Sequence, residues 1–122
     1  MAGILLVDDD EQFRSMLGES LRLAGYEVAE AHDGREGIEL YRDHPGYLII
    51  TDLIMPEQEG LETIQELRRI YPKAKIIAIS GGGRHGSFDY LKMAKTLGAR
   101  QVLAKPFSRQ EILEAITQVM AS

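Results

Sequence analysis

The chain has 122 residues, no cysteine and a formal net charge of −5 at pH 7, which suits a single domain over residues 1–122 that folds without disulfides. The sequence contains no run of Lys or Arg, so direct nucleic-acid binding is not expected, and the lack of cysteine excludes thiolate chemistry. No apolar stretch reaches the roughly 20 residues of a membrane span, and the first residues lack the basic segment of a signal peptide, so the expected location is cytoplasmic.

Five short segments have the patterns of β-strands. Four are apolar almost throughout, which is typical of parallel strands that are covered on both faces. The other alternates apolar and polar residues, so it is predicted to be the second strand, at an edge of the same sheet. In chain order, the predicted strands are residues 4–7, 26–31 (the alternating one), 48–51, 76–79 and 102–104.

Helical patterns separate these strands. Apolar residues recur on one face of each helix, in three sets: Phe13, Met16, Leu17, Leu21 and Ala24; Leu61, Ile64 and Leu67; and Ile112, Ile116 and Val119. Asp33 and Ser108 are placed as N-caps, with Glu111 completing a capping box, and Gly25 and Gly98 are placed as C-terminal caps.

Five strand–helix pairs with short connections predict an α/β fold with one parallel sheet, because each helix must cross over the sheet to start the next strand. We expect a doubly wound, flavodoxin-like fold with strand order 2-1-3-4-5. In such folds ligands bind beyond the carboxyl ends of the strands, near the switch between strands 1 and 3.

Chemically active side chains follow the predicted strands at that edge. They are Asp8, Asp9 and Asp10 after the first strand, Asp52 after the third, Ser80 after the fourth and Lys105 after the fifth. Taken singly, the acidic run could cap the following helix, and Asp52 could be an ordinary loop residue. Together, several carboxylates in one crevice repel one another unless a cation lies among them. Oxygen ligands without cysteine favour Mg²⁺.

Other ligand sites fit the sequence less well. A flavodoxin would offer backbone N–H groups and hydroxyls to the FMN phosphate after the first strand, where this chain has aspartates. The glycines within residues 81–86 do not match a P-loop, so a mobile loop is the preferred interpretation. His32, His44 and His85 have no spacing that indicates a metal site and are assigned no role.

At this point the chain resembles the receiver domains of bacterial response regulators, in particular single-domain, chemotaxis-regulator-like ones of two-component systems. The resemblance rests on four motifs in order and covers essentially the whole chain. These are Asp8-Asp9, Asp52-Leu-Ile-Met55-Pro56 followed by Gly60, Ser80, and Lys105-Pro106-Phe107.

The resemblance implies a phosphorelay function. Asp52 would take a phosphoryl group from a phosphohistidine on a sensor histidine kinase or a histidine phosphotransfer protein. Mg²⁺ would be held by Asp9 and Asp52, by Asp8 through water, and by the backbone carbonyl of Ile54. Lys105 and Ser80 would contact phosphoryl oxygens, and the Lys105–Pro106 peptide bond would be cis. The output surface would be the fourth helix, fifth strand and fifth helix, and the only chemistry catalysed would be the domain's own phosphorylation and dephosphorylation.

Three positions depart from the family pattern. Val102 stands where many receivers have a switch Tyr or Phe, so the usual aromatic readout cannot operate. The glycine-rich residues 81–86 are expected to order on phosphorylation. Ile54 is apolar, which predicts slow self-dephosphorylation. Two alternatives stay open: a Mg²⁺-dependent small-molecule phosphatase or phosphotransferase, and a degenerate receiver-like interaction module.

Overall fold

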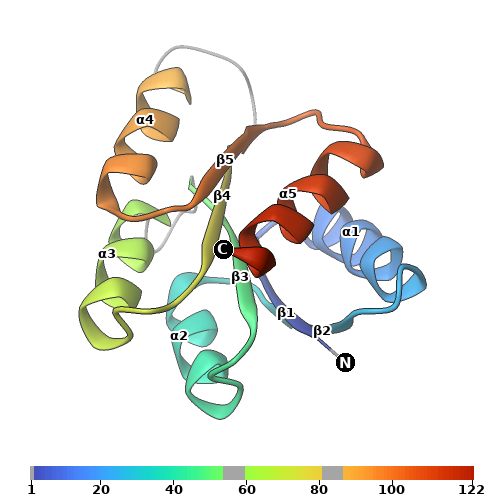
Figure 1. The fold of residues 1–122 in the computed structure, drawn as a ribbon, viewed down its shortest axis with the longest axis horizontal. Coiled ribbons are helices and arrows are strands. Elements are labelled where there is room, and N and C mark those ends of the chain that lie inside the picture. The colour runs from blue at the N-terminus through green and yellow to red at the C-terminus, as the bar shows by residue number, and fades with distance from the viewer. Residues whose placement is uncertain (1, 54–59, 81–86) are drawn as a thin grey trace.

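A computed structural model of the chain describes residues 2–53, 60–80 and 87–122. Strands and helices alternate along the chain (Figure 1). The strands are β1 (Gly3–Val7), β2 (Glu27–Ala31), β3 (Leu48–Asp52), β4 (Ile76–Ser80) and β5 (Gln101–Ala104). The helices are α1 (Glu11–Leu23), α2 (Gly34–Asp43), α3 (Gly60–Ile70), α4 (Ser87–Leu97) and α5 (Arg109–Ala121).

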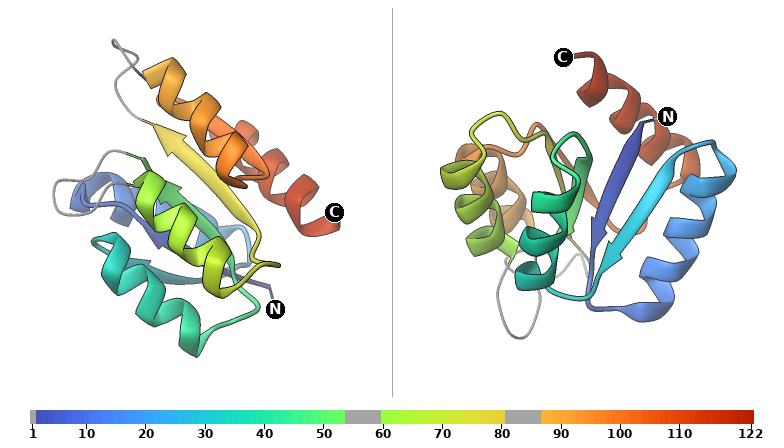
Figure 2. Two further views of the ribbon diagram at one scale, coloured as in Figure 1. Left: turned by 90° about the vertical axis from the view of Figure 1, so that its left-hand side faces the viewer. Right: turned by 90° about the horizontal axis from the view of Figure 1, so that it is seen from below.

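The strands form one five-stranded parallel sheet in the order β2-β1-β3-β4-β5. The predicted fold class and strand order are therefore confirmed. Helices α1 and α5 cover one face of the sheet, and α2, α3 and α4 cover the other (Figure 2). Figure 1 shows α5 lying beside α1, although the two helices come from opposite ends of the chain.

Alternate residues of the central strands feed two separate cores. On β1, Ile4 and Leu6 pack toward α1 and α5, whereas Leu5 and Val7 pack toward α2, α3 and α4. Every residue of β1, β3 and β4 is buried, which explains why these strands are apolar almost throughout. Only β2 and β5 lie at the edges, and they are less buried.

One predicted helix face is partly wrong. Phe13, Leu17 and Leu21 of α1 pack against the sheet, but Met16 is 66% exposed and Ala24 is also exposed. The buried stripe of α1 includes Gly18, which shifts its centre away from Met16. Ala24 is the C-cap and lies beyond the last helical turn.

The predicted helix ends are confirmed. Asp33 caps α2, and Ser108 and Glu111 form the capping box of α5. Gly25 and Gly98 have φ values of 102° and 125°, a conformation that glycine adopts without steric cost. Of the helices in the described ranges, none has the length and hydrophobicity that a membrane crossing requires.

Candidate functional site

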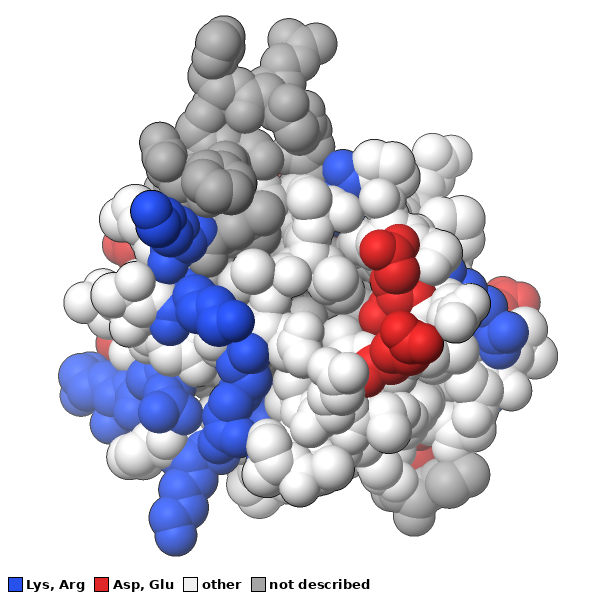
Figure 3. Space-filling model, turned by 45° about the horizontal axis from the view of Figure 1, so that its top comes forward, with Lys and Arg blue, Asp and Glu red and all other residues white. Residues whose placement is uncertain are grey.

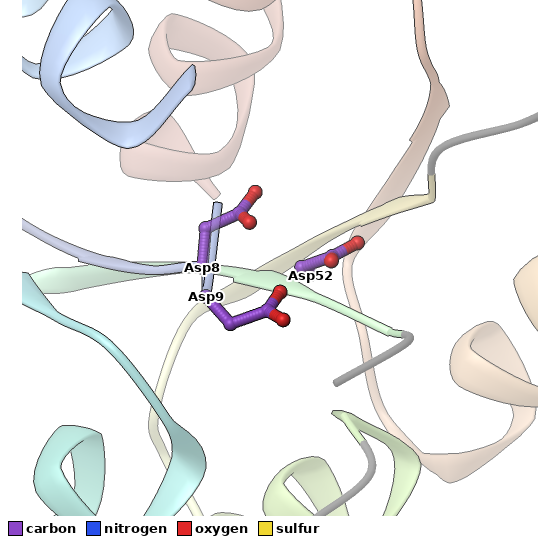
Figure 4. A group of neighbouring side chains, drawn as sticks. All are labelled: Asp8, Asp9 and Asp52. Atoms are coloured by element: carbon purple, nitrogen blue, oxygen red, sulfur yellow. The ribbon is translucent and has the colours of Figure 1, made fainter. Parts of the chain in front are cut away.

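Three carboxylates meet at the carboxyl end of the sheet. Asp8 and Asp9 follow β1, and Asp52 is the last residue of β3, the strand that pairs with β1. One carboxylate oxygen from each residue lies within 4.8 Å of the others. Figure 4 shows the three side chains converging from the two strand ends. The sequence prediction that these acids come together is confirmed, and their spacing suits ligands of one cation.

The three acids differ in their surroundings. Asp8 is fully buried, and its Oδ1 atom accepts a hydrogen bond of 2.9 Å from the backbone N–H of Asp10. Asp52 is 6% exposed, and its Oδ1 atom accepts a bond of 3.0 Å from the N–H of Leu53. Asp9 is exposed. The cluster therefore opens to solvent on the side of Asp9.

Lys105 supplies the positive charge at this edge of the sheet. Its Nζ atom lies 2.9 Å from Oδ2 of Asp8. The backbone N–H of Lys105 donates to the carbonyl oxygen of Ser80 at 2.7 Å, which joins the ends of β4 and β5. The predicted cis peptide bond between Lys105 and Pro106 is present. Among the described residues, the Lys105 ammonium thus pairs with Asp8 and lies near enough to Asp52 to lower its pKa.

The electrostatic balance favours protonation of Asp52. Its pKa is raised from the ordinary value of 3.8 to about 7, first because burial disfavours the charged carboxylate and second because of the negative charge of Asp8. The ammonium of Lys105 and the N–H of Leu53 act in the opposite direction but do not compensate. A divalent cation between the acids would supply the missing positive charge, so the residues present fit Mg²⁺.

Ser80 is fully buried at the end of β4. Within the described part of the chain, its Oγ atom is a buried side-chain atom that has no hydrogen-bond partner. An unpaired buried hydroxyl is costly, and such groups are rare in folded proteins. The hydroxyl is therefore available to a group that enters the site.

Asp10 has a different role from its two neighbours. Its Oδ1 atom accepts a hydrogen bond of 3.1 Å from the N–H of Phe13, which makes Asp10 the N-cap of α1. Capping, the simpler explanation for the acidic run, is thus correct for this residue alone. The predicted roles of Ile54, of Met55 and Pro56, and of residues 81–86 concern positions outside the described residues.

Two residues near the site were not predicted from the sequence. The ring of Phe13 lies under Lys105, with 3.9 Å between Nζ and the ring centroid. Arg14 donates from Nη1 to the carbonyl oxygen of Asp8 at 2.7 Å and from Nε to Glu30 at 3.1 Å. The apolar spacing of the sequence places Phe13 only on a core face. No signal in the sequence distinguished a core phenylalanine from one beside an ammonium group.

Comparison with known proteins agrees with this geometry. The family model of the response regulator receiver domain matches residues 4–117. The chain therefore belongs to the response regulator receiver family. It is 38% identical to the chemotaxis protein CheY of Thermotoga maritima over 95% of each chain.

Solved structures show the same similarity. Chemotaxis protein CheY4 of Vibrio cholerae superposes with a TM-score of 0.86 at 31% identity, over 98% of each chain. A response regulator receiver domain protein of Clostridium thermocellum superposes with a TM-score of 0.92 at 28% identity, over 99% of this chain and 95% of the other. The protein is thus a chemotaxis-like receiver domain with a phosphoacceptor function in two-component signalling. The small-molecule phosphatase and the degenerate module are not favoured.

Proposed function

We propose that Asp52 is the residue that accepts the phosphoryl group. The observation that carries this proposal is the convergence of Asp52, Asp8, Asp9 and Lys105 at one end of the sheet. A carboxylate oxygen of Asp52 attacks phosphorus, the P–N bond to the donor histidine breaks, and the imidazole leaves with the bonding electron pair. The product is an aspartyl phosphate. The domain is a signalling module that catalyses only this transfer to itself and its own dephosphorylation.

The acidic cluster is proposed to hold Mg²⁺. Asp9 and Asp52 would bind the ion directly and Asp8 through water, with the backbone carbonyl of Ile54, outside the described residues, as a further ligand. Mg²⁺ held by these residues would neutralise the charge that gathers on the transferring oxygens. Because a ligand carboxylate must be deprotonated, binding also keeps Asp52 in its nucleophilic form.

Lys105 and Ser80 are proposed to bind the transferred group. The ammonium of Lys105 pairs with Asp8 at 2.9 Å and would donate another of its N–H groups to a phosphoryl oxygen. The buried hydroxyl of Ser80 would donate to another oxygen, which would satisfy an atom that lacks a partner in the described residues. Both residues adjoin β5, so the phosphoryl group would be tied to the strand ends nearest α4 and α5.

The partners are proposed to use different surfaces. The donor, a sensor histidine kinase or a histidine phosphotransfer protein, must reach Asp52 at the carboxyl edge of the sheet. The downstream protein would bind the face made by α4, β5 and α5. On this face basic side chains gather over α4, which carries the exposed Lys92 and Lys95, and acidic ones over α5, which carries the exposed Glu111 and Glu114 (Figure 3).

Two further assignments belong to this proposal. Residues 1–122 form one receiver domain, supported by the single sheet and by a family match that covers most of its length. Its location is cytoplasmic, where the phosphohistidine donors of receiver domains are expected.

Val102 is half-buried on β5 and packs against the core shared by α2, α3 and α4. Because residue 102 is a valine, the rotating aromatic residue that many receivers have at this position plays no part in signalling here.

A direct test uses beryllofluoride, a stand-in for the phosphoryl group, together with Mg²⁺. Amide NMR spectra of the wild type are expected to change at the ends of β1, β3, β4 and β5 and in α4. An Asp52→Asn variant should not respond. Asp10→Asn is the matched control, because it removes a carboxylate from the same strand end but retains an N-cap. An unresponsive wild type, or an unchanged response in Asp52→Asn, would exclude the proposed acceptor.

A further inference from the structure

The ammonium group of Lys105 has a second neighbour besides Asp8. Its Nζ atom lies 3.9 Å from the centroid of the Phe13 ring. The face of an aromatic ring carries negative potential and attracts cations at this distance. Lys105 follows β5 and Phe13 lies in the first turn of α1, so the contact joins two elements from opposite halves of the chain.

The position of the ring is fixed on two sides. The backbone N–H of Phe13 donates to Asp10, the N-cap of α1, at 3.1 Å. The ring packs edge-on against Phe107, with 6.0 Å between centroids and an interplanar angle of 87°. Both phenylalanines are half-buried against the core beneath α1 and α5. Asp10, which follows Asp8 and Asp9 in the chain, and Phe107 thus together place the ring.

A ring differs from a carboxylate as a partner for an ammonium group. A lysine ammonium has three N–H donors, and the hydrogen bond to Asp8 uses one of them. The ring attracts the charge through its face and has no strong acceptor that would occupy another donor. The remaining donors can therefore turn to a phosphoryl oxygen while the ammonium stays in place.

We infer that Phe13 is a positioning residue, which holds the Lys105 ammonium beside Asp52 before and during phosphoryl transfer. The inference rests on the proposed roles of Asp52 and Lys105. It assigns to Phe13 an electrostatic role besides its packing. Replacing the ring with an apolar group of similar bulk should then impair transfer even where packing is preserved.

The test places fluorinated phenylalanines site-specifically at position 13, because successive fluorine atoms weaken the negative ring face with little change in shape. The rate of Asp52 phosphorylation by acetyl phosphate with Mg²⁺ is followed by intact-protein mass spectrometry. The rate should fall stepwise with fluorine number, by about two- to fivefold in total, the change equivalent to one partly exposed cation–π contact. Phe13→Tyr should retain the rate, and Phe13→Leu should lose as much as the most fluorinated ring.

Two further measurements separate positioning from packing. Mg²⁺ affinity should stay constant across the fluorinated series, and the free energy of unfolding should fall by no more than about 1 kcal/mol, the strength of one partly exposed cation–π contact. In the wild type, NMR signals of the Lys105 ε-methylene protons should be displaced upfield by the ring current, and Phe13→Leu should remove the displacement. Equal rates across the series, or undisplaced ε-protons in the wild type, would overturn the inference alone. A wild type that is never phosphorylated on Asp52 would overturn the proposed function and this inference with it.

Discussion

The Nζ atom of Lys105 lies 2.9 Å from Oδ2 of Asp8, although the two residues are 97 positions apart in the sequence. Asp8 is fully buried, while the Lys105 side chain is 18% exposed. The pair forms because β1 and β5 are parallel strands of one sheet, so Asp8 and Lys105, which follow them, emerge at the same carboxyl edge. A buried carboxylate with one cationic partner depends strongly on that partner.

Replacing Lys105 with methionine is therefore expected to destabilise the protein. Loss of the cation leaves the buried carboxylate of Asp8 with its backbone hydrogen bond but without the ammonium, at a cost of about 2 to 4 kcal/mol in the free energy of unfolding. The pKa of Asp52 should also rise, because Lys105 is among the groups that lower it. Urea unfolding at pH 8 and a carbon NMR titration of the Asp52 carboxyl group measure the two effects.

Lys92→Met provides the control for this experiment. Lys92 lies on α4 and is exposed, so its replacement should change the free energy of unfolding by no more than about 0.5 kcal/mol. Equal stability of the two variants would mean that the ion pair contributes nothing to folding.

The raised pKa of Asp52 predicts that stability falls as pH rises. Without Mg²⁺, Asp52 in the folded protein keeps its proton up to about pH 7, because its pKa is raised to about 7. In the unfolded chain the same carboxyl group loses its proton near pH 3.8. The folded state binds more protons between these values, so the free energy of unfolding decreases across this window and the loss is complete above it. The expected decrease from this group is on the order of 2 to 4 kcal/mol.

Asp52→Asn removes this titration and should gain stability over the wild type as pH rises. Urea unfolding at pH 5, 6, 7 and 8 with a chelator present would measure the difference, which should be larger at pH 8 than at pH 5. Parallel curves for the two proteins would show that burial of Asp52 does not disfavour its charge.

The sequence predicted the fold and most of the site because both follow from regular patterns. Apolar runs separated by helical periodicity leave a parallel sheet as the favoured arrangement, and parallel strands bring Asp8, Asp52 and Lys105 to one edge. The sequence could not divide the roles of three consecutive aspartates. That division depends on where β1 ends and α1 begins, which makes Asp10 a cap and leaves Asp8 buried.

Contacts between side chains from distant elements were also beyond sequence reasoning. Phe13 has the spacing of a core residue, and it does pack in the core, yet its ring also faces Lys105. Met16 matched the same apolar spacing but is exposed, because periodicity locates a buried face only to within a residue or so at its margin. Side-chain placement of this kind needs the folded backbone.

Removal of a proposed Mg²⁺ ligand should weaken binding much more than removal of a neighbouring charge. Asp9→Asn is expected to raise the dissociation constant for Mg²⁺ by at least about tenfold, since even residues that only support metal ligands can have effects of that size. Asp10→Asn should change the constant little, because this side chain caps α1 and Asn is an equally good cap. Thermal unfolding at a series of Mg²⁺ concentrations gives both constants.

The same titration should depend on pH. Because Mg²⁺ must displace the proton of Asp52, its affinity should increase as pH rises toward and past about 7 in the wild type. For the two variants of the preceding experiment, equal losses of Mg²⁺ affinity in Asp9→Asn and Asp10→Asn would indicate a nonspecific response to local negative charge.

Ser80→Ala is expected to separate stability from signalling. The buried Oγ atom has no hydrogen-bond partner in the described residues, so its removal should leave the unphosphorylated protein equally stable or more stable by up to about 1 kcal/mol. With beryllofluoride and Mg²⁺, the variant should still bind through Asp52, but the amide shifts in α4 should shrink because the bond that ties the phosphoryl group to β4 is missing. Ser80→Thr retains the hydroxyl and should retain those shifts. A marked loss of stability in Ser80→Ala would show that the hydroxyl already has a partner, and full α4 shifts would show that it does not transmit the signal.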